Sequence, residues 1–184
     1  MIAVTLVTAL LATAPGQPKL FTVHSEKSRL VYHVVHKLHR IEGVSKGVEG
    51  KARVLPDGTA QVQVQTKVAE FDSGNENRDA HVKEAVEAVR YPVVVFKGVA
   101  SGVQLPEKGQ KLNLTLKGEL TFHGVTRPIE VPLTLERVDE QRLTADSTFS
   151  ISLTEFKVER PELLLVKVDD KLDLVMSLSL LEKS

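Results

Sequence analysis

Apolar and polar residues alternate along most of the chain after residue 20, with a period of two. The clearest case is KLNLTLKGELTF, at 111–122. One face of this segment carries Leu112, Leu114, Leu116, Leu120 and Phe122. Strict alternation is typical of a strand with one buried face and one solvated face, the usual habit of antiparallel sheets. The pattern therefore predicts a strand over 111–122, about 40 Å long at ~3.3 Å per residue.

Seven other segments show the same period, and segments rich in turn-forming residues separate several of them. The sharpest of these segments are Pro56–Gly58 and Pro106–Gly109. The further predicted strands are 29–36, 47–55, 61–68, 93–101, 129–138, 142–152 and 171–180.

One segment, 79–89, has a helical period instead. Asp79 is a suitable N-cap, and Pro92 disfavours helix at the residue before it. The apolar stripe of this predicted helix consists of Val82, Ala85, Val86 and Val89.

Eight long strands with one apolar face each must hide their edges, and closure into a barrel does this. The sequence therefore predicts an all-β fold, an eight-stranded antiparallel barrel with one short helix inserted between strands. A barrel of this size either fills with side chains or holds one small apolar ligand.

Composition removes several function classes. The chain has 184 residues, 24 basic against 24 acidic side chains, no cysteine and no tryptophan. The balanced charge gives no basis for binding nucleic acid, and the missing cysteines exclude disulfides and thiolate metal sites. We expect no cofactor.

The first 18 residues differ from the rest. Residues 1–14 are an apolar run ending in Ala12-Thr13-Ala14, which is typical of a secretory signal, although no basic residue follows Met1. A buried N-terminal strand is the alternative. We expect 1–18 to be a signal segment with a linker, and 19–184 to be a single lipid-binding β-barrel domain.

Three of the six histidines lie in HVVHKLH, as His33, His36 and His39. On a strand over 29–36, His36 faces inward and His33 outward, while His39 is expected in a turn that continues to Gly43. This element alone cannot bring the three together on one metal ion.

The stretch Gly43-Val44-Ser45-Lys46-Gly47 matches the hydrolase pattern G-x-S-x-G. That serine requires a strand-to-helix elbow, whereas a strand pattern follows here. A hairpin or bulge is the better interpretation.

Three stretches together resemble the YceI-like family. The first runs from Ser28 to His36 as S-x-L-x-Y-x-V-x-H, with Gly43 and Gly50 following. The other two are NRDAHV with YPVVVF, at 77–82 and 91–96, and GELTFHGVTRP, at 118–128. The resemblance covers roughly 20–180 in the family's order.

This resemblance implies an extended, lipocalin-like barrel that binds a long apolar chain, such as a polyisoprenoid or a fatty-acid derivative, without catalysis. It also implies the bacterial periplasm or the outside of the cell. Two segments depart from the family pattern: 86–92 lacks paired aromatic residues, and 153–158 lacks an arginine and a glycine. These two departures affect the expected identity of the ligand more than the expected fold.

We therefore expect a lipophilic small molecule as the partner and no nucleic acid, and we expect that the protein itself is not an integral membrane protein. The oligomeric state stays open, with a homodimer among the options. For the polar end of the ligand the candidates are His36 and Arg78. The candidate lumen lining is Tyr32, Val34, Val94, Phe96, Leu112, Leu114, Leu116, Phe122, Phe149, Leu174 and Met176.

Two alternatives remain at this point. One is a metal or haem protein, or an enzyme, that uses the histidines. The other is a barrel filled by its own side chains, with a structural or stress-related role. Each inward apolar residue is also an ordinary core residue.

Overall fold

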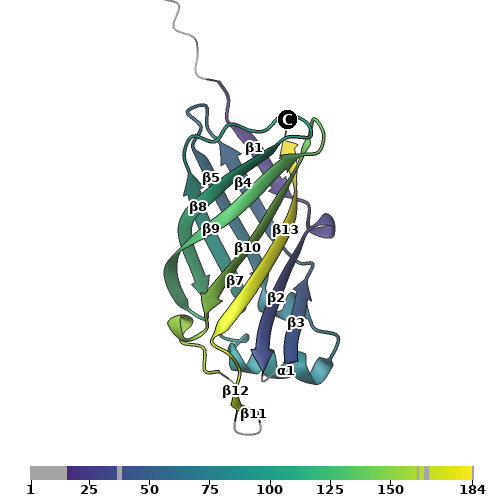
Figure 1. The fold of residues 1–184 in the computed structure, drawn as a ribbon, viewed down its shortest axis with the longest axis vertical. Helices are drawn as coiled ribbons and strands as arrows, with labels where there is room; N and C mark the ends of the chain where they lie inside the picture. Colours follow the sequence, from purple (N-terminus) through teal and green to yellow (C-terminus); the bar gives the residue numbers. More distant parts are fainter. Residues whose placement is uncertain (1–15, 37–38, 161, 164–165, 184) are drawn as a thin grey trace, which may run out of the picture.

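A closed antiparallel barrel of eight strands forms the body of the protein, in the computed structural model that describes residues 16–36, 39–160, 162–163 and 166–183 (Figure 1). Its strand order is β1-β4-β5-β7-β8-β9-β10-β13, and β13 pairs with β1 to close the ring. This confirms the predicted fold class, although the ring contains the unpredicted strand at 19–23 in place of the predicted strand at 29–36. The barrel strands are β1 (Lys19–Val23), β4 (Glu49–Val54), β5 (Ala60–Lys67), β7 (Val93–Ala100), β8 (Lys111–Phe122), β9 (Val125–Arg137), β10 (Arg142–Ser152) and β13 (Lys171–Lys183).

The alternating pattern places the apolar side chains inside. In β8, Leu116, Leu120 and Phe122 are buried, whereas Lys117 and Glu119 between them are exposed. The bounds of β8 and β10 are those that the alternation predicts, because a strand with one wet face keeps its period to its last paired residue.

Two shorter strands pair with the same edge of β13. Its C-terminal part pairs with β1, and its N-terminal part pairs with β2 (Arg29–His36). A short 3₁₀ helix, η1 (Ser25–Lys27), interrupts the run. The Ser28 hydroxyl holds this interruption against β13, because it accepts a hydrogen bond from Ser179 N at 3.0 Å and donates one to His24 O at 2.8 Å.

The strand β3 (His39–Ser45) corrects the predicted turn at 39–43. The register pairs His36 with His39 and Tyr32 with Gly43, so His39 begins a strand. Gly43 suggested a turn, but its backbone is extended as part of β3. The absence of a side chain at Gly43 makes room for the ring of Tyr32. A Cβ placed on Gly43 would lie 2.3 Å from Tyr32 Cε1. The same sheet continues to the short strand β6 (Phe71–Asp72), which follows the 3₁₀ helix η2 (Val68–Glu70).

The helix α1 (Glu76–Ala85) begins and ends earlier than 79–89. Asn75 is the N-cap and accepts from Arg78 N at 3.0 Å. Asp79 instead accepts from Ser73 N at 3.1 Å. The helix ends because Glu87 adopts a left-handed conformation with φ of 45°, which closes a Schellman-type cap. Val89, predicted on the apolar stripe, is fully exposed.

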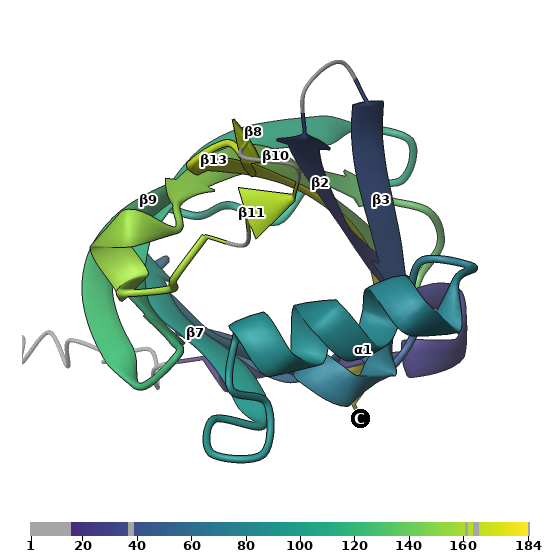
Figure 2. The same ribbon diagram turned by 90° about the horizontal axis from the view of Figure 1, so that it is seen from below.

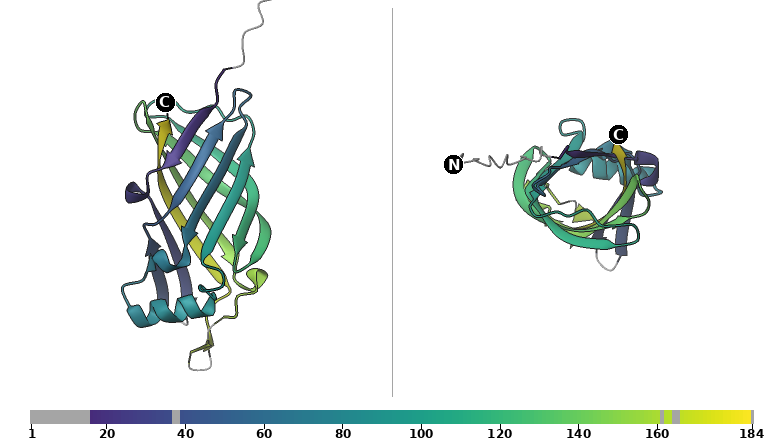
Figure 3. Two further views of the ribbon diagram at one scale, coloured as in Figure 1. Left: turned by 180° about the vertical axis from the view of Figure 1, so that it is seen from behind. Right: turned by 90° about the horizontal axis from the view of Figure 1, so that it is seen from above.

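The helix lies across one side of the lower end of the barrel, as Figure 2 shows from below. The β2–β3 hairpin, the 3₁₀ helix η3 (Thr154–Phe156) and the small hairpin of β11 (Glu162–Leu163) and β12 (Val166–Lys167) lie at this end too. We call it the helix end. The C-terminus lies at the opposite end, and the views from behind and above show the closed ring (Figure 3).

Two clusters of buried residues fill the wall of the barrel. The helix-end cluster contains Tyr32, Phe122 and Phe156. The upper cluster contains Phe21, Leu143 and other residues near the opposite end. Within the described residues, no helix is long and apolar enough to cross a bilayer. The predicted signal segment and linker, 1–18, lies outside the described residues except for 16–18.

Candidate functional site

A cavity of about 580 Å³ runs through the interior of the barrel. Side chains of both the helix-end cluster and the upper cluster line it, and the lining is apolar almost throughout. The barrel is therefore hollow along much of its length, and the hollow offers few hydrogen-bonding groups.

A strap, 101–110, covers the upper end of the cavity. Val103 is buried and Leu105 lines the cavity from above. Gly102 and Gly109 turn the strap at positive φ values of 69° and 77°, a conformation that glycine adopts readily. The strap therefore closes this end with apolar side chains.

Arg137 fastens the strap. This arginine is only 9% exposed, and its Nε donates to Pro106 O at 3.0 Å. Its Nη1 donates to Glu140 O at 3.1 Å and lies 3.3 Å from Glu182 Oε2. A buried guanidinium is tolerated here because backbone carbonyls and a carboxylate satisfy it.

Polar side chains reach the cavity mainly at the helix end. Asn77, Arg78 and His81 of α1 line it there, and His36 lines it from the end of β2. Arg78 is held in place by Ser73, because Nε donates to Ser73 Oγ at 2.8 Å and Nη2 to Ser73 O at 2.5 Å.

The Tyr32 hydroxyl belongs to the same end. Burial, with a smaller contribution from the Asp79 carboxylate, raises the pKa of Tyr32 to about 12, and Arg78 opposes the rise. The phenol therefore stays protonated at neutral pH. Tyr32 also lines the cavity. A donor of this kind is available to an oxygen or nitrogen of a ligand.

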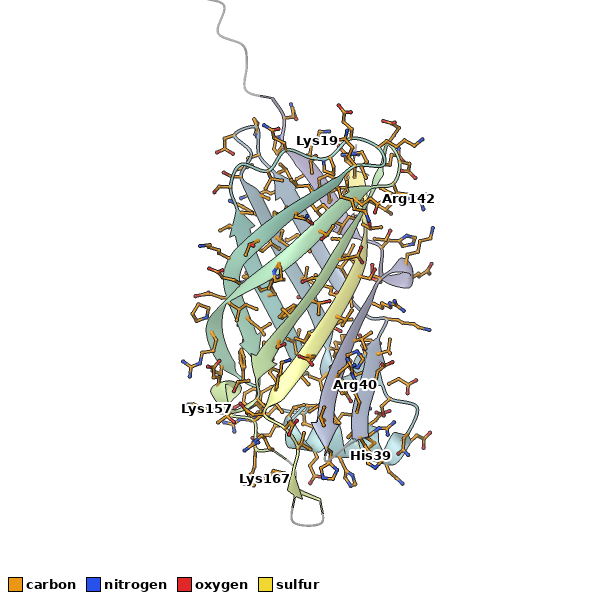
Figure 4. The ribbon with its side chains drawn as sticks, viewed as in Figure 1. Lys19, His39, Arg40, Arg142, Lys157 and Lys167 are labelled. Carbon is orange, nitrogen blue, oxygen red and sulfur yellow. The ribbon has the colours of Figure 1, made fainter. Side chains whose placement is uncertain are left out.

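Exposed basic side chains surround this end as well. His39, Arg40, Lys157 and Lys167 lie around it, whereas Lys19 and Arg142 lie at the upper end (Figure 4). The two upper residues form ion pairs, Lys19 with Glu182 at 3.3 Å and Arg142 with Asp139 at 2.7 Å.

His123 connects three segments at the helix end. Its Nδ1 donates to the Phe156 carbonyl at 3.0 Å, and its Nε2 lies 3.3 Å from Glu87 Oε1. Glu87, His123 and Lys157 are the non-glycine residues with positive φ among the described residues. Backbone strain is thus concentrated where the chain turns around this end.

The cavity brings together the residues predicted to contact a ligand, with the exception of Leu112. That residue packs against the upper cluster and is not among the lining residues, because β8 begins just before it. Contact with a ligand stays a prediction for all of them. The predicted residues that line the cavity are Tyr32, Val34, His36, Arg78, Val94, Phe96, Leu114, Leu116, Phe122, Phe149, Leu174 and Met176.

Sequence reasoning missed part of the lining. It chose no residue from β1, β4 or the strap, although Phe21, Ala52 and Leu105 line the cavity. The alternation in 47–55 and 61–68 could have indicated the inward residues of β4 and β5. Nothing in the sequence shows that the strap folds over the barrel.

The other motifs have structural partners. Ser45 of the G-x-S-x-G stretch is fully buried, and its hydroxyl lies 2.9 Å from Thr66 Oγ1 between two strands. His33 lies on the outer face, with Nδ1 3.4 Å from Glu42 Oε2. Among the residues that the structure describes, no three His, Asp or Glu side chains are grouped closely enough to hold a metal ion.

Several solved structures share this fold. A polyisoprenoid binding domain from Saccharophagus degradans implicated in plant cell wall breakdown superimposes with a TM-score of 0.73 at 15% identity, over 89% of this chain and 98% of that one. BcnA from Burkholderia cenocepacia superimposes with a TM-score of 0.70 at 23% identity, over 85% of this chain and 98% of that one. At these identities the likeness shows the fold.

The sequence relatives match a smaller part of this chain than the solved structures do. A UPF0312 protein from Pseudomonas savastanoi is 26% identical over 109 residues, which is 55% of this chain and 54% of that protein. A UPF0312 protein from Vibrio cholerae is 32% identical over 74 residues, 39% of this chain and 36% of that protein. The chain thus spans about half or less of these relatives. The model of the YceI-like domain matches residues 21–180, and the chain therefore belongs to the YceI-like family.

Proposed function

We propose that this protein is a non-catalytic carrier that holds one long lipophilic chain, a polyisoprenoid or a fatty-acid-like molecule, in the barrel lumen. The observation that carries the proposal is the continuous apolar cavity of about 580 Å³. The polyisoprenoid binding domain from Saccharophagus degradans, which has the same fold, supports the class of ligand.

The volume sets the scale of the ligand. At about 30 Å³ for each water-sized group, 580 Å³ holds roughly 20 carbon groups of a chain. Each methylene that leaves water for an apolar site contributes about 0.8 kcal/mol. About twenty buried methylenes therefore contribute roughly 16 kcal/mol, which offsets an association cost of about 8 kcal/mol and leaves a net affinity around the micromolar range.

The polar end of the ligand belongs at the helix end of the cavity. Tyr32 offers a hydroxyl donor there, and His36 and Arg78 lie at the same end. The cavity is otherwise apolar, so orientation depends on these few groups. We propose that the chain lies along the barrel with its head group towards α1.

Extraction of the purified protein with organic solvent, followed by mass spectrometry, tests the proposal. We expect a lipophilic molecule to be recovered, and the extracted protein to bind added isoprenoid alcohols or fatty acids. Leu114→Trp, which places an indole in the lumen, should weaken that binding, whereas Thr115→Trp on the outer face of the same strand should not. Absence of any extracted lipid together with no binding of added chains would refute the carrier.

Export to the periplasm or the cell exterior is part of the same proposal. It is supported by the apolar run at 1–14, which ends in small residues. Fusion of residues 1–18 to a periplasmic reporter enzyme tests it. Reporter activity outside the cytoplasm supports export, and a fully cytoplasmic reporter contradicts it.

A further inference from the structure

We propose that Gly98 sets the length of chain the lumen accepts, by giving the Phe96 ring a place in the wall. This inference rests on the proposed function and names a residue that determines its specificity. It depends on three observations about the middle of β7.

Phe96 lies between the two halves of the lumen. It lines the cavity and packs against both the helix-end cluster and the upper cluster. An aromatic ring at this level either joins the wall or divides the cavity in two. Because the cavity is continuous and lined from both clusters, the ring here is part of the wall.

Gly98 is what makes the wall position available. It follows Phe96 by two residues on the same strand, so both face the lumen. A Cβ placed on Gly98 would lie 2.6 Å from Phe96 Cζ, 2.8 Å from Phe96 Cε1 and 3.5 Å from Leu116 Cβ. The ring therefore lies directly over the glycine backbone, in a slot beside Leu116.

No backbone requirement explains this glycine. The residues with positive φ include Gly58, Gly74 and Gly102 but not Gly98, which has ordinary strand geometry. Glycine in the interior of a strand costs about 0.5–1 kcal/mol relative to alanine, since it loses more conformational freedom on folding. Its use at an inward position is explained by the space it leaves for the ring.

The neighbouring strand has a different reason for its glycine. Gly118 pairs with Gly98 across β7 and β8, and a Cβ there would meet the backbone of β7, at 2.6 Å from Gly98 Cα. Gly118 therefore allows close approach of two strands. A Cβ on Gly98 would instead meet side chains, with only the Phe96 ring closer than 3.0 Å, so a substitution there can be accommodated if the ring moves.

Any side chain at Gly98 would push the Phe96 ring out of the slot. The backbone of β7 blocks movement outward, so the ring must move into the lumen. The cavity would then be divided at mid-length, and a straight chain could use only one half. The longest chain that gains affinity should fall from roughly 20 carbon groups to about half that number.

The test compares chain-length profiles of the lipid-free protein with straight-chain fatty alcohols in two-carbon steps. For the wild type, affinity should rise roughly tenfold per step until the lumen is full, and then level off. Gly98→Ala should level off at a clearly shorter alcohol. The double variant Gly98→Ala with Phe96→Ala should restore the wild-type profile, because it removes the displaced ring. Val99→Leu, on the outer face next to Gly98, serves as the matched control and should leave the profile unchanged.

A Gly98→Ala profile that levels off with the wild type would overturn this inference and leave the carrier function standing. A double variant that keeps the short profile would overturn it as well. A wild type that binds none of the alcohols would overturn the inference and the carrier function together. If Gly98→Ala does not fold, Phe96→Trp replaces it: the indole is larger than the slot and should also shorten the profile, and an unchanged profile would contradict the inference.

Discussion

Two phenylalanines distinguish an open lumen from a packed core. Phe156 is 1% exposed, does not line the cavity, and has its ring centroid 5.7 Å from that of Phe122. Phe149 lines the cavity and is only partly buried. Truncation of Phe156 to alanine leaves a new hole in packed protein, whereas truncation of Phe149 widens a hole that already exists.

The two truncations should therefore differ in cost. Phe156→Ala should lower the free energy of unfolding by about 3–5 kcal/mol, since both the transfer of the ring and the new cavity count against it. Phe149→Ala should cost about 1–2 kcal/mol, because part of the ring already faces empty space. For a protein of this size these values correspond to melting temperatures lower by about 10 °C and about 5 °C respectively.

Urea unfolding of lipid-free protein, followed by circular dichroism, measures both costs. The unfolding slope must agree between the variants and the wild type, since a changed slope would mean a changed denatured or native state. If Phe149→Ala costs as much as Phe156→Ala, the lumen is packed in solution and the reasoning behind the carrier fails.

Three further predictions concern charges and their partners. Burial raises the pKa of Tyr32 from 10.0 to about 12, so the wild type should lose about 2–3 kcal/mol of stability as the pH rises from 10 to 12. Urea unfolding at each pH measures this loss, and Tyr32→Phe should not show it. The Ser152 hydroxyl is foremost among the hydrogen-bond donors that hold the pKa of Asp170 below its usual value, so the stability that this carboxylate supplies should be lost as the pH falls through the lowered pKa. Asp170→Asn should therefore flatten the acid part of the profile of unfolding free energy against pH. An unchanged acid part would contradict the assignment. Arg137→Met should cost about 3 kcal/mol because it leaves the buried Pro106 carbonyl of the strap without its donor, whereas Arg142→Met at a surface pair should cost less than about 1 kcal/mol. Equal costs would show that the strap does not depend on its buried arginine.

Seven of the eight barrel strands were predictable because each has one wet face, whereas the short strand β1 was not predicted. The alternation in β8 and β10 continues to their ends, so their bounds follow from the sequence. The strand β3 was not predictable in this way. Its inward position at Gly43 carries no apolar side chain, and the Tyr32 ring from the neighbouring strand supplies the missing cover.

The ends of α1 show a second kind of limit. Asn75 and Asp79 are both good N-cap residues, and the sequence does not choose between them. The choice follows from a contact outside the helix, since Asp79 is held by Ser73 and leaves Asn75 to cap. The early end of the helix depends on the left-handed Glu87 and its contact with His123, which is far away in the sequence.

The candidate site was predictable to the extent that inward residues of a barrel share one lumen. The inward faces of β2, β7, β8, β10 and β13 follow from the period of two, and the residues predicted on them line the cavity apart from Leu112. The two ends of the lumen were not predictable. The strap depends on Arg137, and the polar helix end depends on the position of α1, both of which are set by tertiary contacts.

A single tryptophan placed in the lumen tests the central claim most directly, because the natural chain has none. Phe149→Trp reports from inside the barrel, and Val99→Trp from its outer face. Titration of each lipid-free variant with a fatty acid brominated along its chain should quench the fluorescence of the lumen tryptophan, and the quenching should saturate at one chain per protein. The outer tryptophan should stay unquenched. Equal quenching of the two, or none at the lumen position, would contradict the claim that this barrel holds an apolar chain inside.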